Sequence, residues 1–390
     1  MPVVNRFADL HDEIAAWRRD IHEHPELMFD VHRTAGMVAE KLRAFGCDEV
    51  VEGLGRTGVV GIIRGRETGS GRVIGLRADM DALPITEATG KPWASKTPGK
   101  MHACGHDGHT AMLLGAARYL AETRNFDGAV AVIFQPAEEG GGGGREMVED
   151  GIMERFGLSE VYGLHNMPNL PEGQFAVRPG PAMGAADHLE IEIEGRGGHA
   201  AKPHECVDTT LVGAHVITAL QGIVARNVDP VEACVVTIAQ MHTDGAAGNV
   251  IPQTARLTGT VRTLSLAVQD IVEARIKTTC EHVARAFGAE ARVRYVRNYP
   301  VTINTPDRAA FCAEVAREIA GEAGVDPDTP PLLGAEDFSF MLNARPGAMI
   351  FLGAGPGASV HHPEYDFNDA IIPAGCSYWA RLVERALPAA

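Results

Sequence analysis

The sequence lacks the features that would place a protein in a membrane or outside the cell. No apolar run approaches the roughly 20 residues that a membrane-spanning helix requires. The first residues show no charged leader followed by an apolar stretch, so we expect no secretory signal. The seven cysteines are an odd number without paired spacing, which favours reduced thiols over a disulfide framework. We therefore expect a cytoplasmic protein.

Basic residues are scarce relative to acidic ones. The chain has 35 Lys and Arg against 51 Asp and Glu, which gives a formal net charge of −16. This balance disfavours nucleic acids and anionic membranes as partners, because both attract positive charge. The 45% hydrophobic and 22% charged content is ordinary for a globular protein. Since 390 residues are too many for one core, we expect at least two domains.

What the sequence does contain is an alternation of apolar runs and helical patterns. Apolar residues recur at helical spacing from residue 9 to residue 45, apart from a break at His24-Pro25. Helical stretches, such as residues 109–124, then separate short apolar runs that are typical of buried strands. The alternation predicts an α/β fold with a mostly parallel sheet flanked by helices. The runs are 59–63, 72–80, 129–135, 160–167 and 348–354.

A second pattern occupies residues 188–297, where the predicted elements follow the order β-α-β-β-α-β. This order is typical of a ferredoxin-like α+β unit. Because the run at 348–354 resumes the first pattern, we expect the small domain to be inserted into the larger one. The sequence therefore predicts a discontinuous catalytic domain and an inserted lid and dimerisation domain, with hinges in 178–184 and 297–306. The catalytic domain comprises residues 1–185 and 298–390, and the lid comprises residues 186–297.

Metal-capable side chains gather in the stretch "MHACGHDGHT" (101–110), which holds three histidines, a cysteine and an aspartate. Further candidates follow the buried strands. In open α/β sheets, ligands bind at the carboxyl ends of the strands, so we expect these groups to converge. A thiol with several imidazoles and carboxylates suits Zn²⁺ or Mn²⁺ better than Ca²⁺ or Mg²⁺. The residues after strands are Asp79, Asp81, Glu138, Glu139, His165, His361 and His362.

Each of these features alone has a simpler explanation. A single Cys-x-His usually packs in a core, a Glu pair is usually solvated, and a single histidine is often a hydrogen-bonded core residue. The glycines at 140–144 are not followed by Gly-Lys-Ser/Thr, so they indicate a mobile loop rather than a phosphate loop. It is the coincidence of several such groups at strand ends that favours a metal site.

The motifs and their order closely resemble the M20 metallopeptidases. The resemblance is to the branch of hippurate hydrolases, N-acyl-amino-acid amidohydrolases and auxin-conjugate hydrolases. It covers nearly the whole chain, starting at "RRDIHEHPEL", and it implies a catalytic α/β domain with an inserted lid. The motifs are "LRADMDALPI", "MHACGHDGHTAMLLGAA", "FQPAEEGGGGGREMVEDG", "GLHNMP", "GRGGHAAKPH", "GAEDFSFML" and "VHHPEYDFND".

The resemblance implies two divalent metal ions. Cys104 would bridge them, a role that an aspartate fills elsewhere in the family. Asp79 stands where many relatives have a ligating histidine, so we expect His106 to compensate. The sequence does not decide among Zn²⁺, Mn²⁺, Co²⁺ and Ni²⁺, because availability selects among metals with similar ligands. The implied ligands are Cys104, His106, Glu139, His165 and His361, the last chosen over His362 for its spacing to residues 363–365.

Two carboxylates are expected to assist the metals. A pair of divalent ions can lower the pKa of a water molecule and polarise a carbonyl group. Glu138 is the candidate general base, which would take the proton from the water and deliver it to the leaving amine. Its neighbour Glu139 can still be a ligand, because successive side chains of an extended stretch point in opposite directions. Asp81 is expected to fix the tautomer of an imidazole ligand.

The lid is expected to supply substrate contacts. His199 alone would be taken for an exposed hairpin histidine. In the family, a histidine here stabilises the oxyanion, often in the site of a dimer partner. Asn249 and Arg262 could hold the carboxylate of the substrate, since the guanidinium fork matches a carboxylate. A purely structural strand arginine explains Arg262 equally well.

The leading hypothesis is a binuclear metal-dependent amidohydrolase that cleaves small N-acyl amino acids such as hippurate and forms a homodimer through the lid. One alternative is a dipeptidase or carboxypeptidase of the same family. A non-catalytic metal-dependent binding protein is a third possibility, although such a protein would not need the spare base Glu138. A thiol-redox protein is disfavoured, because the sequence has no Cys-x-x-Cys pair.

Overall fold

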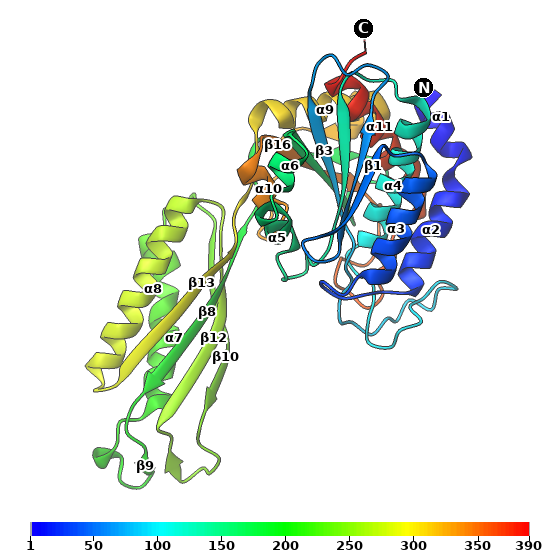
Figure 1. Cartoon of the computed structure of the whole chain (residues 1–390). Helices are drawn as coiled ribbons and strands as arrows, with labels where there is room; N and C mark the ends of the chain where they lie inside the picture. The colour runs from blue at the N-terminus through cyan, green and yellow to red at the C-terminus, as the bar shows by residue number, and fades with distance from the viewer. Residues whose placement is uncertain (1, 390) are drawn as a thin grey trace. The chain divides into compact units, whose positions relative to one another are not determined.

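The chain folds into two compact units in the computed structural model, which describes residues 2–389 (Figure 1). The predicted insertion, residues 186–297, lies inside unit 2. Unit 2 also takes in the short segment 331–336, which no sequence pattern indicated. Unit 1 comprises Met1–Ala182, Ile303–Pro330 and Asp337–Ala390, and unit 2 comprises Met183–Thr302 and Pro331–Glu336.

Unit 1 is built on an eight-stranded sheet with the order β1-β2-β4-β3-β5-β16-β6-β15. Its central neighbours β4, β3, β5 and β16 run parallel, whereas β1 and β2 pair antiparallel at one side. The central strands are buried on both faces, which is why their sequences are almost continuously apolar. The predicted fold class is confirmed. The strands are β1 (Glu49–Leu54), β2 (Gly58–Arg64), β3 (Val73–Asp79), β4 (Ala129–Gln135), β5 (Leu158–Met167), β6 (Phe175–Ala176), β15 (Val325–Asp326) and β16 (Gly347–Gly353).

Helices cover both faces of this sheet. Figure 1 shows α1 to α4 on one side and α5, α6 and α10 on the other. The predicted break at His24-Pro25 is present, since α2 ends at Glu23 and a residue before proline is disfavoured in a helix. The helices are α1 (Pro2–Asp9), α2 (His11–Glu23), α3 (His32–Ala44), α4 (His106–Thr123), α5 (Gly143–Glu149), α6 (Ile152–Arg155), α9 (Pro306–Ala320), α10 (Ser339–Ala344) and α11 (Ile372–Ala386).

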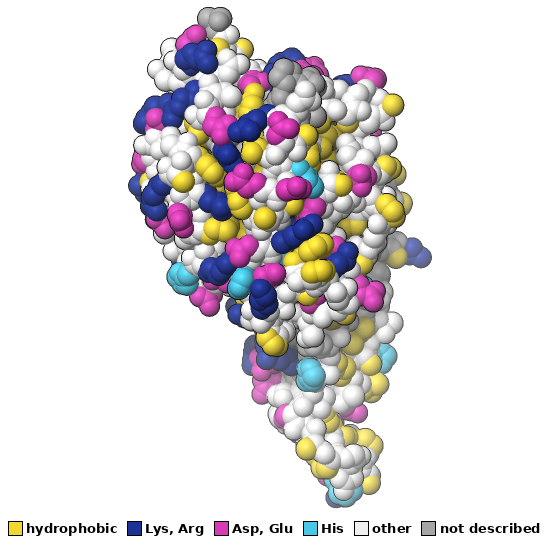
Figure 2. Space-filling view, turned by 90° about the vertical axis from the view of Figure 1, so that its right-hand side faces the viewer, with side chains coloured by type: hydrophobic (Ala, Val, Ile, Leu, Met, Phe, Trp, Pro, Cys, Tyr) yellow, Lys and Arg dark blue, Asp and Glu magenta, His cyan; other side chains and the backbone are white. Residues whose placement is uncertain are grey.

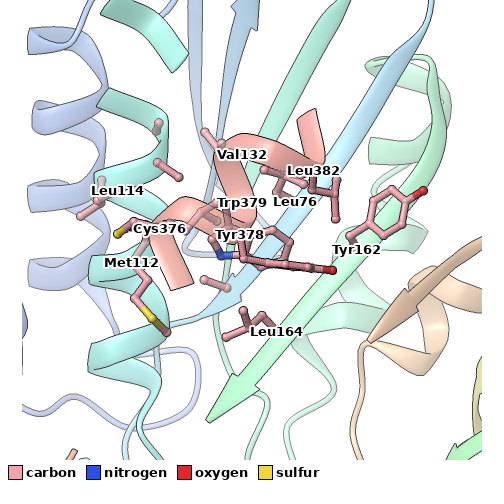
Figure 3. Close-up of a cluster of buried hydrophobic side chains, with 14 of the residues drawn as sticks. Leu76, Met112, Leu114, Val132, Tyr162, Leu164, Cys376, Tyr378, Trp379 and Leu382 are labelled. Atoms are coloured by element: carbon pink, nitrogen blue, oxygen red, sulfur yellow. Dashed lines mark hydrogen bonds between the residues drawn. The ribbon is translucent and has the colours of Figure 1, made fainter. Parts of the chain in front are cut away.

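The core of unit 1 fixes α4, whose first turn carries the metal-capable stretch. Trp379 and Tyr378 of α11 lie between the sheet and Met112 of α4 (Figure 3). Full burial of a large apolar side chain stabilises a fold by about 1.5–3 kcal/mol. A Cβ at Gly375 would lie 2.2 Å from the Met112 sulfur, so α11 and α4 are in close contact. The position of α4 is therefore set by packing far from its N-terminus.

Unit 2 has the predicted β-α-β-β-α-β order, and its four-stranded antiparallel sheet has the order β10-β12-β8-β13. Residues of β8 alternate between buried and accessible, and the buried set packs with α7 and α8 on one face. A two-stranded ribbon of β9 (Gly198–His199) and β11 (Val250–Ile251) adjoins it. The other elements are β8 (Ala185–Glu194), α7 (Thr209–Asn227), β10 (Cys234–Thr243), β12 (Thr254–Thr263), α8 (Leu266–Ala286) and β13 (Glu290–Tyr299).

The chain passes between the units in β7 (Gly180–Met183) and β14 (Thr302–Asn304). Among the described residues, no helix combines the length and apolar character that crossing a bilayer would need.

Acidic and basic side chains are interspersed over the face shown in Figure 2, without a broad area of one sign.

Candidate metal centre

The predicted ligands meet where the central strands of unit 1 end. Strand β3 ends at Asp79, and the segment after β4 carries Glu138 and Glu139. His165 lies near the end of β5, and α4 begins at His106. Because these strands are parallel, their carboxyl ends lie at one edge of the sheet, as ligand sites in such folds do.

Two groups of metal-capable side chains share Cys104. One group is Cys104, His106 and His165, and the other is Cys104, Glu139 and His361. Within each group, the candidate ligand atoms all lie within 4.8 Å of one another. The Cys104 Sγ is 3.5 Å from His165 Nε2, and His361 Nε2 is 3.3 Å from Glu139 Oε1. A residue common to two groups is what a bridging ligand requires, so this geometry is compatible with the predicted bridge.

The structure brings His361 to this cluster and leaves His362 out of it. His361 has a φ of 66°, unusual for a residue other than glycine. Its backbone N–H donates to the Ala103 carbonyl at 2.6 Å, which ties it to the Cys104 loop. The Nδ1 of His362 accepts a hydrogen bond from the Glu364 N–H, and His362 is in none of the metal-capable groups of the described residues.

Two buried polar atoms at the centre of the cluster fit a cation. His106 Nε2 and Glu139 Oε1 have no hydrogen-bond partner among the described residues, and they lie 4.0 Å apart. Buried polar atoms are nearly always hydrogen-bonded, so such atoms call for an explanation. A divalent ion would satisfy both, and the combination of thiol, imidazole and carboxylate is one that Zn²⁺ or Mn²⁺ accepts.

The electrostatics of the cluster favour added positive charge. Burial disfavours a charged His106 ring, but the buried carboxylate of Asp79 favours it, and the pKa of His106 is raised well above its usual value. Burial also raises the pKa of the Cys104 thiol to about 12, so the thiol stays protonated at neutral pH in the absence of a metal. Because thiolate is the form that binds a metal, binding at Cys104 would release a proton.

The imidazole rings are held in the tautomer that metal binding needs. His106 Nδ1 donates to the Asp81 carbonyl oxygen at 2.8 Å, and His165 Nδ1 donates to the Asn166 carbonyl oxygen at 2.7 Å. In both rings the Nε2 atom is thereby left for a ligand. Burial lowers the pKa of His165 to about 3, which keeps the ring neutral.

Asp81 contributes in two ways. Its carbonyl oxygen, rather than its carboxylate, makes the short bond to His106. Its carboxylate accepts the backbone N–H groups of Glu138 at 2.9 Å and of Glu139 at 3.2 Å. Glu138 is 7% exposed, and its carboxylate lies within 4.8 Å of candidate ligand atoms of His106 and Glu139. Asp81 thus fixes the turn that presents the predicted base beside the predicted ligand.

Comparison with known proteins identifies the family. The model of peptidase family M20/M25/M40 matches residues 75–385. The chain belongs to peptidase family M20. The resemblance seen in the motifs is therefore confirmed, as is the prediction of an enzyme of a binuclear metal hydrolase family.

Individual M20 relatives match over nearly the whole chain. Hippurate hydrolase of Campylobacter jejuni is 42% identical over 387 residues, covering 99% of this chain and 100% of that protein. Thermostable carboxypeptidase 2 of Saccharolobus solfataricus is 40% identical, covering 90% of this chain and 88% of that protein. The crystal structure of Bacillus subtilis YXEP, a dinuclear metal-binding M20 peptidase, superposes with a TM-score of 0.85 at 33% identity, covering 97% of this chain and 99% of that chain.

His109 and Asn166 of this M20 site had no role assigned from the sequence, and Asp79 was named only as a metal-capable residue. Asp79 and His109 form another metal-capable group with the predicted ligand His106, but the Asp79 carboxylate is already engaged by Arg77 at 2.8 Å and by His109 at 2.6 Å. Burial opposes ionisation of Asp79, yet the charges of His106 and Arg77 outweigh it and hold the pKa of Asp79 well below its usual value. For Asn166, only its place beside His165 in the sequence could have pointed to a role.

The predicted substrate residues all lie in unit 2 of this M20 chain. His199 and Asn249 are exposed and adjoin in the β9–β11 ribbon, where the Ala200 N–H donates to the Asn249 carbonyl at 3.0 Å. Arg262 is half-buried on β12, and its guanidinium donates hydrogen bonds to the Thr260 hydroxyl and the Val261 carbonyl rather than to a carboxylate. Burial lowers the pKa of Arg262, with the charge of Asp187 opposing it.

Proposed function

We propose that this M20 enzyme hydrolyses the amide bond of small N-acyl amino acids and releases a carboxylic acid and a free amino acid. The observation that carries this proposal is the pair of ligand groups sharing Cys104, with the carboxylate of Glu138 beside them. An amide is a poor electrophile, so its hydrolysis by water requires both a base and stabilisation of the developing oxyanion. Unit 1 offers Glu138 as the base, and a metal pair would stabilise the oxyanion.

The proposed metal ligands are Cys104, His106, Glu139, His165 and His361, holding two divalent ions. Zn²⁺ or Mn²⁺ is proposed, and Co²⁺ or Ni²⁺ would suit the same ligands. When bound, such ions lower the pKa of a water molecule and polarise the carbonyl of the substrate. His106 Nε2 and Glu139 Oε1, which make no hydrogen bond among the described residues, support a cation at this point.

Glu138 is proposed as the general base. Its carboxylate takes a proton from the attacking water and then donates it to the leaving nitrogen, so that a free amine departs. Two features support this role. The backbone of Glu138 is fixed by Asp81, and its side chain lies within the metal-capable cluster without being part of either group that shares Cys104.

Arg262 and Asn249 are proposed to recognise the free carboxylate of the substrate. A half-buried guanidinium that is hydrogen-bonded to a hydroxyl and a backbone carbonyl, and not to a carboxylate, is costly unless a ligand supplies the missing charge. The 42% identity with a hippurate hydrolase supports an N-acylated amino acid as the substrate. Hippurate itself has both required features, an amide and a free carboxylate.

A carboxypeptidase or dipeptidase is the second candidate, favoured by the 40% identity with a thermostable carboxypeptidase. Its substrates share the scissile amide and the terminal carboxylate with N-acyl amino acids. They differ on the other side of the amide, where a peptide carries a further amino group or chain. The two candidates therefore predict the same metal site and differ only in the pocket for the acyl side.

We further propose a homodimer formed through unit 2. The two edges of its sheet differ, since β13 carries Arg292, Arg294 and Arg297 whereas β10 has no charged residue. Charged side chains protect an edge strand from pairing, so β10 is the edge open to a second copy. Antiparallel pairing of two β10 strands would make a self-complementary twofold interface.

The dimer would explain how unit 2 serves the site. Arg262 lies eight positions along β12 from Thr254, which is next to the His199 ribbon. Eight steps along a β-strand span about 27 Å, which is longer than an N-acyl amino acid. One copy of unit 2 cannot bring His199 and Arg262 to the same substrate. We therefore propose that His199 and its ribbon neighbour Asn249 act in the site of the partner, where His199 stabilises the oxyanion and Asn249 joins the Arg262 of that other copy at the substrate carboxylate.

Sedimentation and a charge on β10 test this dimer. Wild type should sediment as a dimer at micromolar concentration, and Thr237→Glu, an exposed change on β10, should give monomers. The matched change Arg294→Glu on β13 should leave the dimer intact. A wild-type protein that sediments near 41.5 kDa would refute the dimer.

All seven cysteines are free in the structure, which describes every one of them. Free thiols support the proposed location in the reducing cytoplasm. Fractionation of cells would test this directly.

A substrate panel tests the proposed activity. Purified protein supplied with Zn²⁺ or Mn²⁺ is incubated with hippurate, N-acetyl amino acids and dipeptides, and released amino acid is measured. The proposal predicts the highest kcat/KM for N-acyl amino acids. A preference for dipeptides would establish the second candidate. No turnover of any amide, with metal bound, would establish a non-catalytic binding protein instead.

A further inference from the structure

A second tier of buried polar residues lies behind the proposed ligands. Arg77, Asp79, His109 and Asn166 are each at most 2% exposed. None of them is a proposed ligand or base. Burying so many polar groups is costly unless each is hydrogen-bonded, and these are bonded to one another.

The four residues form a continuous chain of hydrogen bonds. Arg77 donates to Asp79 Oδ2 at 2.8 Å, and His109 Nδ1 donates to Asp79 Oδ1 at 2.6 Å. On the other side of the His109 ring, Nε2 faces Asn166, with Oδ1 at 2.6 Å and the backbone N–H at 3.1 Å. Arg77 is in turn anchored by Gln135 at 2.9 Å and Asp337 at 3.1 Å. The ring of His109 is therefore clamped from both sides.

Asn166 is the point at which this chain meets the ligand-bearing segments. Its carbonyl oxygen accepts from His165 Nδ1, and its side-chain Nδ2 donates to the Tyr365 hydroxyl at 2.8 Å. Tyr365 belongs to the loop that carries His361. The amide also packs against Gly105, where an added Cβ would lie 2.1 Å from Asn166 Oδ1. With φ of +96°, Gly105 gives the Cys104 loop the close approach that Asn166 needs.

We propose that Asn166 and His109 are positioning residues for the metal site. Clamped by Asp79, His109 fixes the side chain of Asn166, and Asn166 holds three segments in register: the Cys104–His106 loop, His165, and the His361 loop. The inference rests on the ligand set of the proposed function. It also assigns Asp79 the role of an anchor, although Asp79 and His109 could by distance alone join His106 around an ion.

The side chain of Asn166 can be removed without touching any proposed ligand. Asn166→Ala keeps the backbone, including the carbonyl that accepts from His165 and the N–H that faces His109, but it loses the bond to Tyr365 and the side-chain contact with His109. Loss of a residue that orients metal ligands typically lowers metal affinity by about 10- to 100-fold. We expect a loss in this range for Asn166→Ala, measured as the Zn²⁺ dissociation constant by competition with a chromophoric chelator.

Asn304 provides a matched control in the same unit. It too is a buried asparagine that bridges segments, because its Oδ1 accepts from the Met349 N–H and its Nδ2 donates to the carbonyl oxygens of Met349 and Arg178. None of its partners is a proposed ligand. Asn304→Ala should lower the thermal midpoint of the metal-free protein but keep Zn²⁺ affinity within about threefold of wild type.

A double-mutant cycle links the two positioning residues. His109→Gln should also weaken Zn²⁺ binding while leaving two ions per chain at saturation. Because His109 acts through Asn166, the double variant His109→Gln/Asn166→Ala should be little worse than Asn166→Ala alone. In Co²⁺-substituted protein, both single variants should shift the thiolate-to-metal absorption band, which reports the geometry at Cys104.

The outcomes separate this inference from the proposed function. A wild-type protein that binds no Zn²⁺ would refute the proposed function itself. Wild-type-like affinity in Asn166→Ala, or an equal loss in Asn304→Ala, would overturn the positioning role alone. Additive losses in the double variant would overturn the coupling, and loss of one ion per chain in His109→Gln would show that His109 is a ligand.

Discussion

The two units hold their predicted functional residues in opposite ways. In unit 1, Cys104 and His106 are buried. The His106 ring is fixed by the hydrogen bond from its Nδ1 to the Asp81 carbonyl oxygen, and its Nε2 faces the proposed metal. In unit 2, His199 and Asn249 are exposed on a ribbon whose strands have two residues each. The side chains of unit 1 are held in place by packing and hydrogen bonds without a ligand, whereas the exposed side chains of unit 2 have few contacts to fix them.

The difference has a physical basis in what each site has to do. A metal site needs several ligands within a few ångströms in fixed tautomers, so rigid packing and outer hydrogen bonds favour it. Exposed residues on short strands have few contacts and open at low free-energy cost. Such residues suit contacts made only when the substrate is bound. The proposed function thus separates a preorganised metal site in unit 1 from an exposed substrate-recognition surface in unit 2.

Metal removal should produce the largest difference between the two units, because only unit 1 holds the proposed metal site. Chelation should abolish amide hydrolysis, and added Zn²⁺ or Mn²⁺ should restore it. Hydrogen exchange should show loss of protection in residues 101–110 and 136–142 of unit 1, because their buried polar atoms lose a cation. The strands of unit 2 should be unaffected and serve as the internal control. Activity that survives thorough chelation would contradict the metal mechanism.

Glu138→Gln should have the next largest effect, again confined to unit 1. The amide keeps the size of the side chain but cannot take a proton from water. We expect kcat to fall by roughly 10²- to 10⁴-fold, while metal content and the thermal midpoint stay near those of wild type. Steady-state kinetics with elemental analysis checks this, and turnover close to wild type would remove Glu138 as the base.

Arg262→Ala should act on substrate binding without changing the metal site. Loss of a charged hydrogen bond to the substrate carboxylate should raise KM about 10- to 100-fold. Arg256→Ala is the matched control, since Arg256 lies on the same strand but is 61% exposed and pairs with Glu190. If both variants show the same KM, Arg262 is a structural strand residue.

The smallest expected effect is a pH dependence of the stability of unit 1. Burial disfavours charge on His22, but Asp107, 2.8 Å from its Nδ1, outweighs it and raises the pKa of His22 from 6.5 to about 9. Because its pKa is higher in the folded chain, protonated His22 stabilises the fold. This contribution is fully present below pH 6.5 and is lost as the pH rises through about 9. Thermal midpoints should therefore fall between pH 7 and 9.5 by a few degrees more in wild type than in His22→Gln.

A histidine of unit 2 controls for this pH effect. His282 is exposed on α8, so His282→Gln should retain the wild-type pH dependence. Identical slopes for wild type and His22→Gln would show that the His22–Asp107 pair does not contribute.

Much of the fold was predictable because the central strands are buried on both faces. Runs such as 129–135 are continuously apolar, and residues 188–297 show the period-two and helical patterns of a β-α-β-β-α-β unit. The two-residue strands β6 and β15 were not predicted, since two residues have no periodicity. The segment 331–336 of unit 2 was missed for a related reason, as it joins that unit only through tertiary contacts.

The clustering of the candidate ligands was predictable where metal-capable side chains and the ends of strands or helices coincide. Cys104, Glu139 and His165 combine a metal-capable side chain with a place at the end of an element. The roles of His109 and Asn166 depend instead on partners 30 and 57 residues away in the sequence. No local pattern encodes such pairings, because the fold alone determines which buried polar groups meet.

The central proposal is that Cys104 would be shared by two metal ions in one site of unit 1. Elemental analysis of wild type and Cys104→Ala, after reconstitution with Zn²⁺ and removal of excess metal, tests it most directly. The account predicts two ions per chain in wild type and fewer than two in the variant, because a bridging thiolate contacts both ions. Two ions per chain in Cys104→Ala would contradict the bridge.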